Sequence, residues 1–471
     1  MSGVESSLSR GQLSIAERLE RLPVGRFHRR FIGLVSLGGW FDLYDLFMVA
    51  YLGAALESSH FFTLRQFSFF VAAGFLGMFL GTVVFGIASD RVGRRSAFVI
   101  MLLVYSGFTM AGALAGSAEW LIVTRFLAGV GIGAEIVVID TYVTELVPSG
   151  VRGRFVAITQ VIGFTSVPVV ALLSRLLVPT HFLIAGWRWV MVIGSAGGVL
   201  AWYFRLRLPE SPRWLAERGR DREAEAIVAE LEAESGVRPA RQPAAAPVAE
   251  PQRKAPLAAV ALAGPRQAPL LAAFAELWRP PYGQRTVMLI MFQTLQTFGF
   301  YGFANWAPTF LLERGLPLLS SLDYTLLIAL VAPIGPLVAA FTSDRLERKY
   351  TIAATALLIG GLGLGFALWR QPALIILSGA LLTLCNNCFS ANFHAYQSEL
   401  FPTRIRATGV GFTYSWSRLS AAFTSLLIGA LLVYGVTAVF ALLAAAMAAV
   451  AIVVLLLGPR SNGLPLEELS A

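Results

Sequence analysis

Long apolar segments alternate with short polar gaps along almost the whole chain. Twelve segments hold about 20 mostly apolar residues each, which is the length that an α-helix needs to cross a bilayer. We therefore expect an all-α membrane protein with about twelve transmembrane helices. The predicted spans are residues 31–55, 66–88, 96–116, 120–147, 155–177 and 187–206, followed by 284–312, 324–342, 351–369, 372–400, 408–434 and 437–457.

A long polar segment separates the sixth span from the seventh. We expect a cytoplasmic N-terminal segment (1–30), an N-terminal six-helix bundle (31–206), a cytoplasmic linker with a surface helix (207–283), a C-terminal six-helix bundle (284–457) and a cytoplasmic tail (458–471). In the linker, Ser211 and Pro212 are typical of a helix start. In the first segment, Leu19 and Leu22 belong to an apolar spacing that predicts an amphipathic helix at the membrane surface.

Two motifs occur twice, with 254 residues between the copies both times. One begins at Ser89 and again at Ser343, and the other begins at Glu145 and again at Glu399. A shared offset indicates a duplicated half, so the two bundles should be pseudo-symmetric. We expect the charged motif residues to gate the cytoplasmic side, by latching the two halves together and by holding acidic helix ends. They are Asp90, Arg91, Arg94, Arg95, Glu145, Arg152, Arg154, Asp344, Arg345, Glu399 and Arg406.

Composition supports this interpretation and excludes several classes of function. The chain is 56% hydrophobic and 14% charged, whereas soluble proteins carry about a quarter charged residues. The net charge of +9 comes from residues in the gaps between spans, which argues against a nucleic-acid partner. The gaps after spans two, four, eight and ten hold the basic clusters. Because positive loops stay inside, both termini should be cytoplasmic and the protein should lie in the inner membrane.

No motif for a cofactor or for an enzyme is present. The chain lacks a phosphate-binding loop of the Gly-x-x-x-x-Gly-Lys type, so a proton gradient is the expected energy source. The two cysteines, Cys385 and Cys388, lie in an apolar span without further metal ligands. We interpret them as packing residues rather than a metal site or redox pair.

Ionisable residues inside predicted spans are the main candidates for function, because each costs about 2.5–3.5 kcal/mol on insertion scales. Asp42 and Asp45 lie near mid-depth of the first span and, three residues apart, share one face. A carboxyl that gains and loses a proton is what proton coupling needs. The alternative is that one Asp only bonds a neighbouring helix. Glu135, in the fourth span, is weighed equally between a proton role and structural pairing.

Two arginines also lie within predicted spans. Arg125 in the fourth span is expected to pair with a carboxylate from span one or four. Arg418 lies near mid-depth of the eleventh span, and its half supplies no acidic residue at that depth. A substrate carboxylate could bind it through two parallel hydrogen bonds. The alternative is an ion pair across the halves with Asp42, Asp45 or Glu135.

Uncharged polar and aromatic residues complete the predicted substrate site. With Arg418, the candidates are Tyr44, Gln293, Gln296, Asn305, Trp306 and Asn387. Their alternative role is hydrogen bonding or packing between helices. His394, near the cytoplasmic end of the tenth span, is interpreted as a gate or packing residue.

The motifs resemble those of the major facilitator superfamily over nearly the whole chain. Residues 86–95 are similar to its loop signature between the second and third helices, and residues 125–133 to its fourth-helix signature. Residues 145–154 and 209–215 resemble the sugar-porter branch. However, residues 384–388 replace that branch's Gly-Pro-x-Pro-Trp pattern, and its paired Gln-Gln is missing. Residues 27–45 look more like proton-coupled carriers of aromatic and other small carboxylates, including nicotinate carriers.

This resemblance implies a secondary transporter that moves a small organic anion together with protons. Two six-helix halves would rock about a site at mid-membrane. The expected partners are the small-molecule substrate, protons and the lipid bilayer, with the protein a monomer. A proton-coupled sugar or polyol symporter is the alternative within transporters. A membrane receptor that binds a metabolite without moving it is the alternative from another class.

Overall fold

The computed structural model describes residues 15–133, 135–197, 199–200, 203, 207–235, 274–342, 346–401 and 403–460. Within these ranges the regular structure is helical throughout, which confirms the all-α fold. The first half comprises α2 (Arg26–Ser58), α3 (Leu64–Val92), α4 (Arg94–Ala113), α5 (Ala118–Ile132), α6 (Glu135–Leu146), α7 (Ser149–Phe164), α8 (Ser166–Leu177) and α9 (Gly186–Gly194). The second comprises α14 (Tyr282–Ala304), α15 (Ala307–Glu313), α16 (Leu318–Ala329), α17 (Ile334–Thr342), α18 (Arg348–Leu368), α19 (Pro372–Glu399), α20 (Thr403–Leu431), the short 3-10 turn η1 (Leu432–Tyr434) and α21 (Val436–Leu457).

Ten helical stretches among the described residues are long and apolar enough to cross a membrane. The expected fourth span corresponds to α5 and α6, which are separated around residue 134, outside the described residues. The expected sixth span begins with α9 and continues into residues that are only partly described. The arrangement agrees with about twelve transmembrane segments in two bundles.

Three predicted spans contain breaks that hydrophobicity did not show. The fifth divides into α7 and α8 at Thr165, the seventh into α14 and α15 at residues 305–306, and the eighth into α16 and α17 at residues 330–333. Proline explains each break, because it lacks a backbone N–H and its ring disturbs the preceding turn. Pro168, Pro308 and Pro333 stand at or just after these positions.

Helix starts repeat with the same offset as the sequence motifs. α3 and α16 begin at residues 64 and 318, α4 and α18 at 94 and 348, α5 and α19 at 118 and 372, and α7 and α20 at 149 and 403. Each pair is 254 residues apart. The duplication inferred from two motifs therefore extends over the helical framework of both halves.

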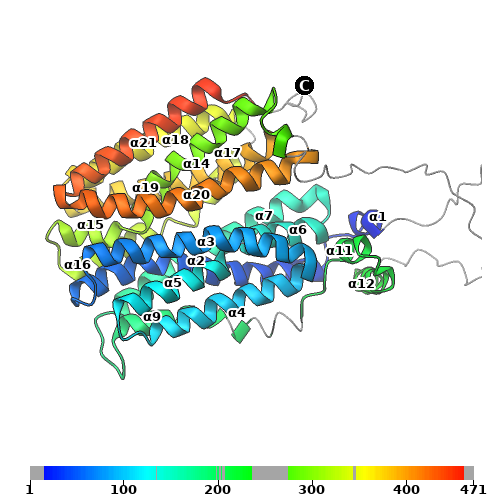
Figure 1. Cartoon of the computed structure of the whole chain (residues 1–471), viewed down its shortest axis with the longest axis horizontal. Coiled ribbons are helices and arrows are strands. Elements are labelled where there is room, and N and C mark those ends of the chain that lie inside the picture. The colour runs from blue at the N-terminus through cyan, green and yellow to red at the C-terminus, as the bar shows by residue number, and fades with distance from the viewer. Residues whose placement is uncertain are drawn as a thin grey trace, which may run out of the picture.

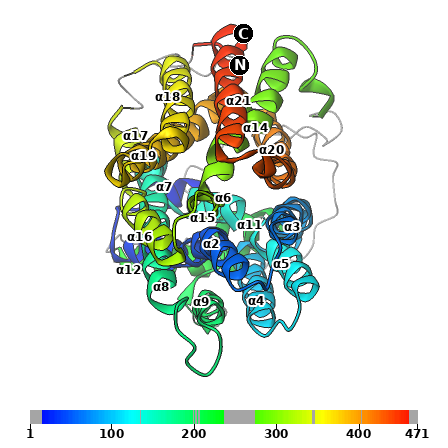
Figure 2. The same ribbon diagram turned by 90° about the vertical axis from the view of Figure 1, so that its left-hand side faces the viewer.

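The two halves lie side by side, with α20 of the second half along α3 of the first (Figures 1 and 2). The contact is close: a Cβ on Gly429 would come within 1.8 Å of the Ser68 hydroxyl. Phe67 packs edge-on against Trp306, with 4.7 Å between ring centroids. Phe75 contacts Tyr301 at the same distance.

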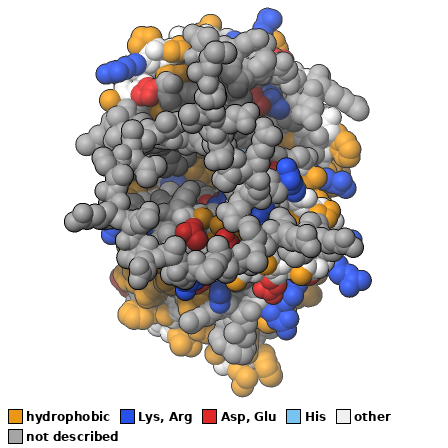
Figure 3. Space-filling model, turned by 90° about the vertical axis from the view of Figure 1, so that its right-hand side faces the viewer, with side chains coloured by type: hydrophobic (Ala, Val, Ile, Leu, Met, Phe, Trp, Pro, Cys, Tyr) orange, Lys and Arg blue, Asp and Glu red, His pale blue; other side chains and the backbone are white. Residues whose placement is uncertain are grey.

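A small helical group projects from one end of the bundles (Figure 1). It consists of α1 (Ile15–Glu20), α11 (Pro212–Glu217) and α12 (Asp221–Glu234). As predicted, the Ser211 side chain caps α11 by accepting from the backbone N–H of Trp214 at 3.3 Å, and Pro212 begins that helix. Figure 3 shows this end of the molecule, where blue basic and red acidic side chains are visible between the grey atoms.

The N-terminal helix differs from the prediction of a helix at the membrane surface. Its Leu19 and the following Leu22 are almost fully buried in the protein core, in the same cluster as Leu231. Arg18 forms two hydrogen bonds, of 2.8 and 2.7 Å, with the Glu232 carboxylate of α12. The linker helices therefore cover the apolar face that sequence periodicity had assigned to lipid.

Candidate functional site

A cavity of about 650 Å³ lies between the two halves. Helices α2 and α7 of the first half and α14, α19 and α20 of the second supply its walls. The lining residues are Leu43, Leu46, Phe47, Gln160, Phe164, Gln293, Gln296, Phe300, Tyr301, Phe389, Ser390, Phe393, His394 and Tyr414. None of these described residues is Asp or Glu, so the cavity wall itself carries no carboxylate. Half of the lining residues are Phe or Tyr, which suits a flat ligand.

One polar wall of the cavity is a chain of hydrogen bonds between α14 and α19. Gln296 Nε2 donates to Gln293 Oε1 at 3.3 Å, and Gln293 Nε2 donates to Gln397 Oε1 at 3.1 Å. Gln397 Nε2 then lies 3.1 Å from His394 Nδ1. The chain forms because residues three apart lie on one face of a helix, and each helix supplies one such pair.

Arg418 stands directly behind this cavity. It donates to the Tyr301 hydroxyl at 2.7 Å and to the Tyr414 hydroxyl at 3.2 Å, and both tyrosines line the cavity. Arg418 itself is only 3% exposed, and its Nε has no hydrogen-bond partner among the described residues. The charge of Asp42 acts on Arg418 across the halves. In this conformation the guanidinium therefore meets the cavity through two hydroxyls rather than directly.

A second cavity, of about 520 Å³, shares Phe47 and Phe300 with the first. Its walls are mainly apolar, but Asn386 and Asn387 of α19 also line it. The Asn387 amide donates to the Ala332 carbonyl at 2.9 Å, where α16 has ended and that carbonyl lacks a helical partner. Asn386 donates to the Gly299 carbonyl at 3.2 Å, and its side-chain oxygen is buried without a partner.

Asp45 and Arg125 form a buried ion pair inside the first half. Their side chains are 0% and 3% exposed, respectively. Asp45 also accepts from the Thr109 hydroxyl at 2.9 Å, and Arg125 lies 5.8 Å from the ring centroid of Phe70. The structure thus contains the pairing between spans one and four that the sequence predicted for Arg125. Asp45 is bound to α4 and α5, whereas the charge of Asp42 acts on α20.

Several other predicted substrate residues lie away from the main cavity. The Tyr44 hydroxyl donates to the Val190 carbonyl of α9 at 3.1 Å, within the first half. Trp306 packs on Phe67, and Asn305 lines a separate cavity of about 170 Å³ beside Arg125. The side chain of Glu135 lies outside the described residues. Gln397 was not predicted from the sequence, and His394 was interpreted only as a gate or packing residue, although their three-residue spacing is visible in the sequence.

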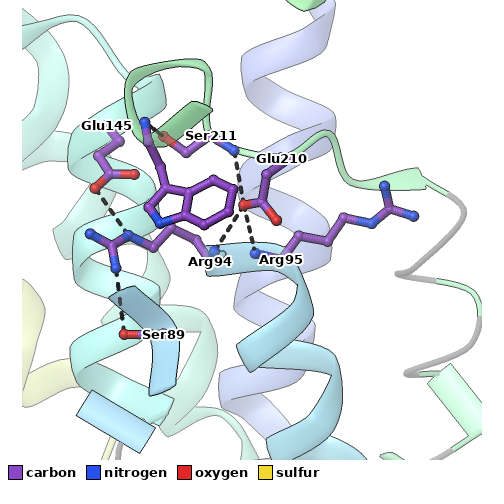
Figure 4. Close-up of polar contacts among 7 residues, drawn as sticks. Ser89, Arg94, Arg95, Glu145, Glu210 and Ser211 are labelled. Carbon is purple, nitrogen blue, oxygen red and sulfur yellow. Dashed lines mark hydrogen bonds and ion pairs between the residues drawn. The ribbon is translucent and has the colours of Figure 1, made fainter. Parts of the chain in front are cut away.

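The repeated motifs form a polar cluster at the end of the first half (Figure 4). Arg94 Nε donates to Glu145 at 3.1 Å, which joins α4 to α6. Glu210, just before α11, accepts from the backbone N–H groups of Arg94 and Arg95 at 2.8 and 3.1 Å. It therefore caps the N-terminus of α4, where a carboxylate is electrostatically favoured. Gly93, with φ of +96°, lets Glu210 approach, since a Cβ there would lie 2.3 Å from its carboxylate.

The second half repeats this ion pair, because Arg348 contacts Glu399 at 2.6 and 2.8 Å. Each of these two ion pairs lies within one half. The latch between the halves depends on Asp90, whose side chain lies outside the described residues, and it stays a prediction. Arg91 and Arg154 are exposed. The other motif residues are outside the described structure, either wholly or in their side chains; they are Asp90, Arg152, Asp344, Arg345 and Arg406.

Among the described ion pairs, Arg175 of α8 and Asp323 of α16 join the two halves. Helix α16, which carries Asp323, lies at the end of the bundles that is remote from α1, α11 and α12 (Figure 1). Both side chains are partly exposed. The halves are therefore tied at the end opposite the motif clusters.

The known proteins that this chain resembles are transporters. The family model described as sugar (and other) transporter matches residues 33–471. The putative metabolite transport protein YyaJ of Bacillus subtilis is 34% identical over 95% of this chain and 96% of that protein. The niacin transporter NiaP of Acinetobacter baylyi is 30% identical over 97% of this chain and 100% of that protein.

The solved structures give the same fold. The xylose transporter XylE from E. coli, in a partially occluded inward-open conformation, superposes with a TM-score of 0.72. The two chains are 17% identical, over 93% of this chain and 99% of that one. Another structure of XylE, with a TM-score of 0.68 and 18% identity over 94% and 98% of the two chains, is described as a proton:xylose symporter.

Proposed function

The chain belongs to the sugar (and other) transporter family of the major facilitator superfamily, and from this premise we propose that it is a proton-coupled symporter of a small aromatic carboxylate. The fold and the relatives support a multi-pass membrane transporter rather than an enzyme. Substrate class and coupling are inferred from the two buried charge centres described above. We place both termini in the cytoplasm of a bacterial cell, on the side of the basic motif clusters.

The observation that carries the substrate class is the combination of Arg418, Tyr301 and Tyr414 behind a cavity without carboxylates. The two hydroxyl oxygens accept from Arg418, so their own protons point elsewhere. Because both tyrosines line the cavity, their hydroxyl protons can be donated to a ligand there. An ionised carboxylate only accepts hydrogen bonds, and its negative charge would be attracted by Arg418.

The aromatic walls and one relative narrow the substrate class further. Phe47, Phe164, Phe300 and Phe389 surround the polar wall and can pack against a planar ring. Niacin, which NiaP of A. baylyi is named for, is a pyridine carboxylic acid. A flat ring with one carboxylate therefore matches both the chemistry of the cavity and the name of a relative that aligns over its whole length.

For proton coupling we propose Asp45, held by Arg125 and Thr109. Proton uptake would neutralise Asp45 and remove half of a buried ion pair, which changes the packing preferences of α2, α4 and α5. Asp42, on the same helix, acts electrostatically on Arg418. A substrate carboxylate near Arg418 would compete with that interaction. The first helix thus links the proton site to the substrate site, and alternating access follows if the two halves rock about the cavity.

A sugar or polyol symporter remains the second candidate, supported by the amides of Gln160, Gln293 and Gln296 in the same cavity. Amides donate and accept, as recognition of hydroxyl groups requires. The two candidates differ in the role of Arg418, since a neutral sugar gives a guanidinium no opposite charge.

The test is uptake of labelled nicotinate, nicotinamide and xylose into proteoliposomes. Under a proton gradient directed along the transport direction, we expect accumulation of nicotinate above equilibrium, and neither accumulation nor competition by xylose. Arg418→Lys should weaken nicotinate binding roughly ten- to hundredfold, because Lys lacks the rigid, planar set of donors with which Arg418 holds both tyrosine hydroxyls. Nicotinamide binding should change much less. Accumulation of xylose, or equal losses for acid and amide, would favour the sugar candidate instead.

A further inference from the structure

The chain of glutamines between α14 and α19 has a direction, because the two ends of an amide differ. Its oxygen only accepts hydrogen bonds, and its nitrogen only donates them. Gln296 donates to Gln293, and Gln293 donates to Gln397. The Gln397 oxygen is thereby engaged, and its Nε2 is the atom that faces His394 Nδ1 at 3.1 Å. His394 Nδ1 must then accept.

A neutral imidazole carries one proton, so a ring that accepts at Nδ1 carries the proton on Nε2. The positive charge of Arg418 acts on this ring, and a second positive charge beside it would be unfavourable. The neutral ring therefore presents one donor, the Nε2–H, on the side that does not face Gln397. Gln296, Gln293 and Gln397 thus determine that Nε2 is the ring atom that can bind a ligand, and that it does so as a hydrogen-bond donor.

His394 is accessible in the cavity. It is exposed although it lies within the bundle, and it lines the same cavity as Gln293, Gln296 and Tyr414. Its ring centroid is 5.6 Å from that of Tyr414, which accepts from Arg418. The rings of His394 and Tyr414 are therefore neighbours in the wall of this cavity.

We propose that His394 is a substrate-binding residue, whose Nε2–H donates to the carboxylate of an aromatic acid and whose tautomer is held by Gln296, Gln293 and Gln397. This inference rests on the proposed function and adds to Arg418 a second residue that discriminates acid from amide. A carboxylate offers acceptor oxygens to His394 and to the tyrosines together. A primary amide of the same ring also brings N–H donors toward these donors, which leaves hydrogen bonds unmade.

Two substitutions separate the roles of the two ring nitrogens. In His394→Gln, the amide nitrogen reaches about as far as Nε2 and can still donate into the cavity. In His394→Asn, the shorter amide can meet Gln397 near the Nδ1 position but supplies no donor to the ligand. We expect His394→Gln to bind nicotinate within about threefold of wild type, and His394→Asn to lose roughly tenfold or more. Nicotinamide should bind both variants almost alike.

Affinity would be measured by calorimetry on the full chain in detergent, with unfolding temperature as a check on folding. His181→Asn is the matched control, because His181 is an exposed histidine in the loop between α8 and α9. The inference is overturned if His394→Asn keeps full preference for nicotinate over nicotinamide while Arg418→Lys loses it. That result would leave the proposed function standing. If wild type itself shows no preference for the acid, both fail.

The hydrogen-bonded chain from Gln296 through Gln293 and Gln397 to His394 is tested separately by nitrogen-15 NMR of labelled histidine in proteoliposomes. The chain has four histidines, so the His394 signals can be identified as those missing from His394→Asn. We expect an unprotonated Nδ1 and a protonated Nε2 without ligand, and a loss of this preference in Gln397→Leu. A protonated Nδ1 in wild type would overturn the inference that the glutamines hold this tautomer of His394, whether or not nicotinate binds. Gln397→Leu should also weaken nicotinate binding when it is made in the wild-type chain, but not when it is combined with His394→Gln.

Discussion

Replacing Asp45 by Asn tests the buried ion pair in the first half most directly. The substitution keeps the size of the side chain, and its amide oxygen can still accept from Arg125 while its amide nitrogen faces the Thr109 hydroxyl, which can accept instead, but it removes the negative charge. Because both partners are buried, Arg125 would keep its charge without a counter-charge. Removing one partner of a buried ion pair costs about 3–5 kcal/mol. The preserved hydrogen bonds should place Asp45→Asn near the lower end of that range.

Two measurements separate stability from coupling. Denaturant unfolding in mixed micelles should show the loss of about 3 kcal/mol for Asp45→Asn, and a partial recovery in Asp45→Asn with Arg125→Met, where no charge is stranded. In proteoliposomes, Asp45→Asn should abolish accumulation driven by a pH gradient, because an amide cannot release a proton. Exchange of internal for external substrate should persist, since it needs no net proton movement.

Asp42→Asn is the matched comparison, because it places the same change three residues away on the same helix. We expect it to alter substrate affinity through Arg418 and to disturb stability less than Asp45→Asn. If Asp45→Asn still concentrates substrate against its gradient, Asp45 does not carry the proton. If both variants do so, neither Asp is the carrier and Glu135 becomes the next residue to replace.

The remaining predictions concern the contacts that hold each half and join the two halves. Glu210→Ala should lower unfolding stability by about 0.5–2 kcal/mol, because α4 loses its capping carboxylate; an unchanged unfolding temperature would contradict the cap. Asp323→Ala should leave stability within about 1 kcal/mol, since its ion pair with Arg175 is partly exposed. It should instead shift the balance of states up to about fivefold toward opening at that end, which cysteine accessibility in the cavity would detect. Gly429→Leu should prevent the close approach of α20 to α3 and slow exchange, and normal rates would show that this contact is not needed for closure.

The general architecture could be predicted from sequence because few physical rules dominate it. Hydrophobic length gave the spans, and one offset gave the duplicated halves. The breaks at Thr165 and at residues 330–333 were missed because a mildly apolar helix and a broken one have the same hydrophobicity. The face of the N-terminal helix was assigned to lipid because Leu19 and Leu22 show which side is apolar, but not which surface covers it.

The candidate site was predictable only in part, for a related reason. Depth and charge identified Asp45, Arg125 and Arg418, since a buried ionisable group has few inexpensive environments. The direction in which a side chain points could not be predicted from the sequence. Tyr44, for example, was expected at the substrate, but its hydroxyl donates to α9 instead. Pairing between distant helices was also hidden, so the bonds from Gln293 to Gln397 and onward to His394 could not be inferred from either helix alone.

The repeat itself separates framework from function. Where the 254-residue offset pairs like with like, the residues hold a half together, as Arg94 with Glu145 and Arg348 with Glu399 show. The offset places other residues opposite ones that cannot share their chemistry: Arg125 corresponds to Gly379, Arg418 to Phe164 and His394 to Asp140. A duplicated scaffold needs these stabilising ion pairs twice, because each half must fold. One proton site and one substrate site are enough for a single transport cycle. We therefore expect that cycle to depend on the charged residues that differ between the two halves.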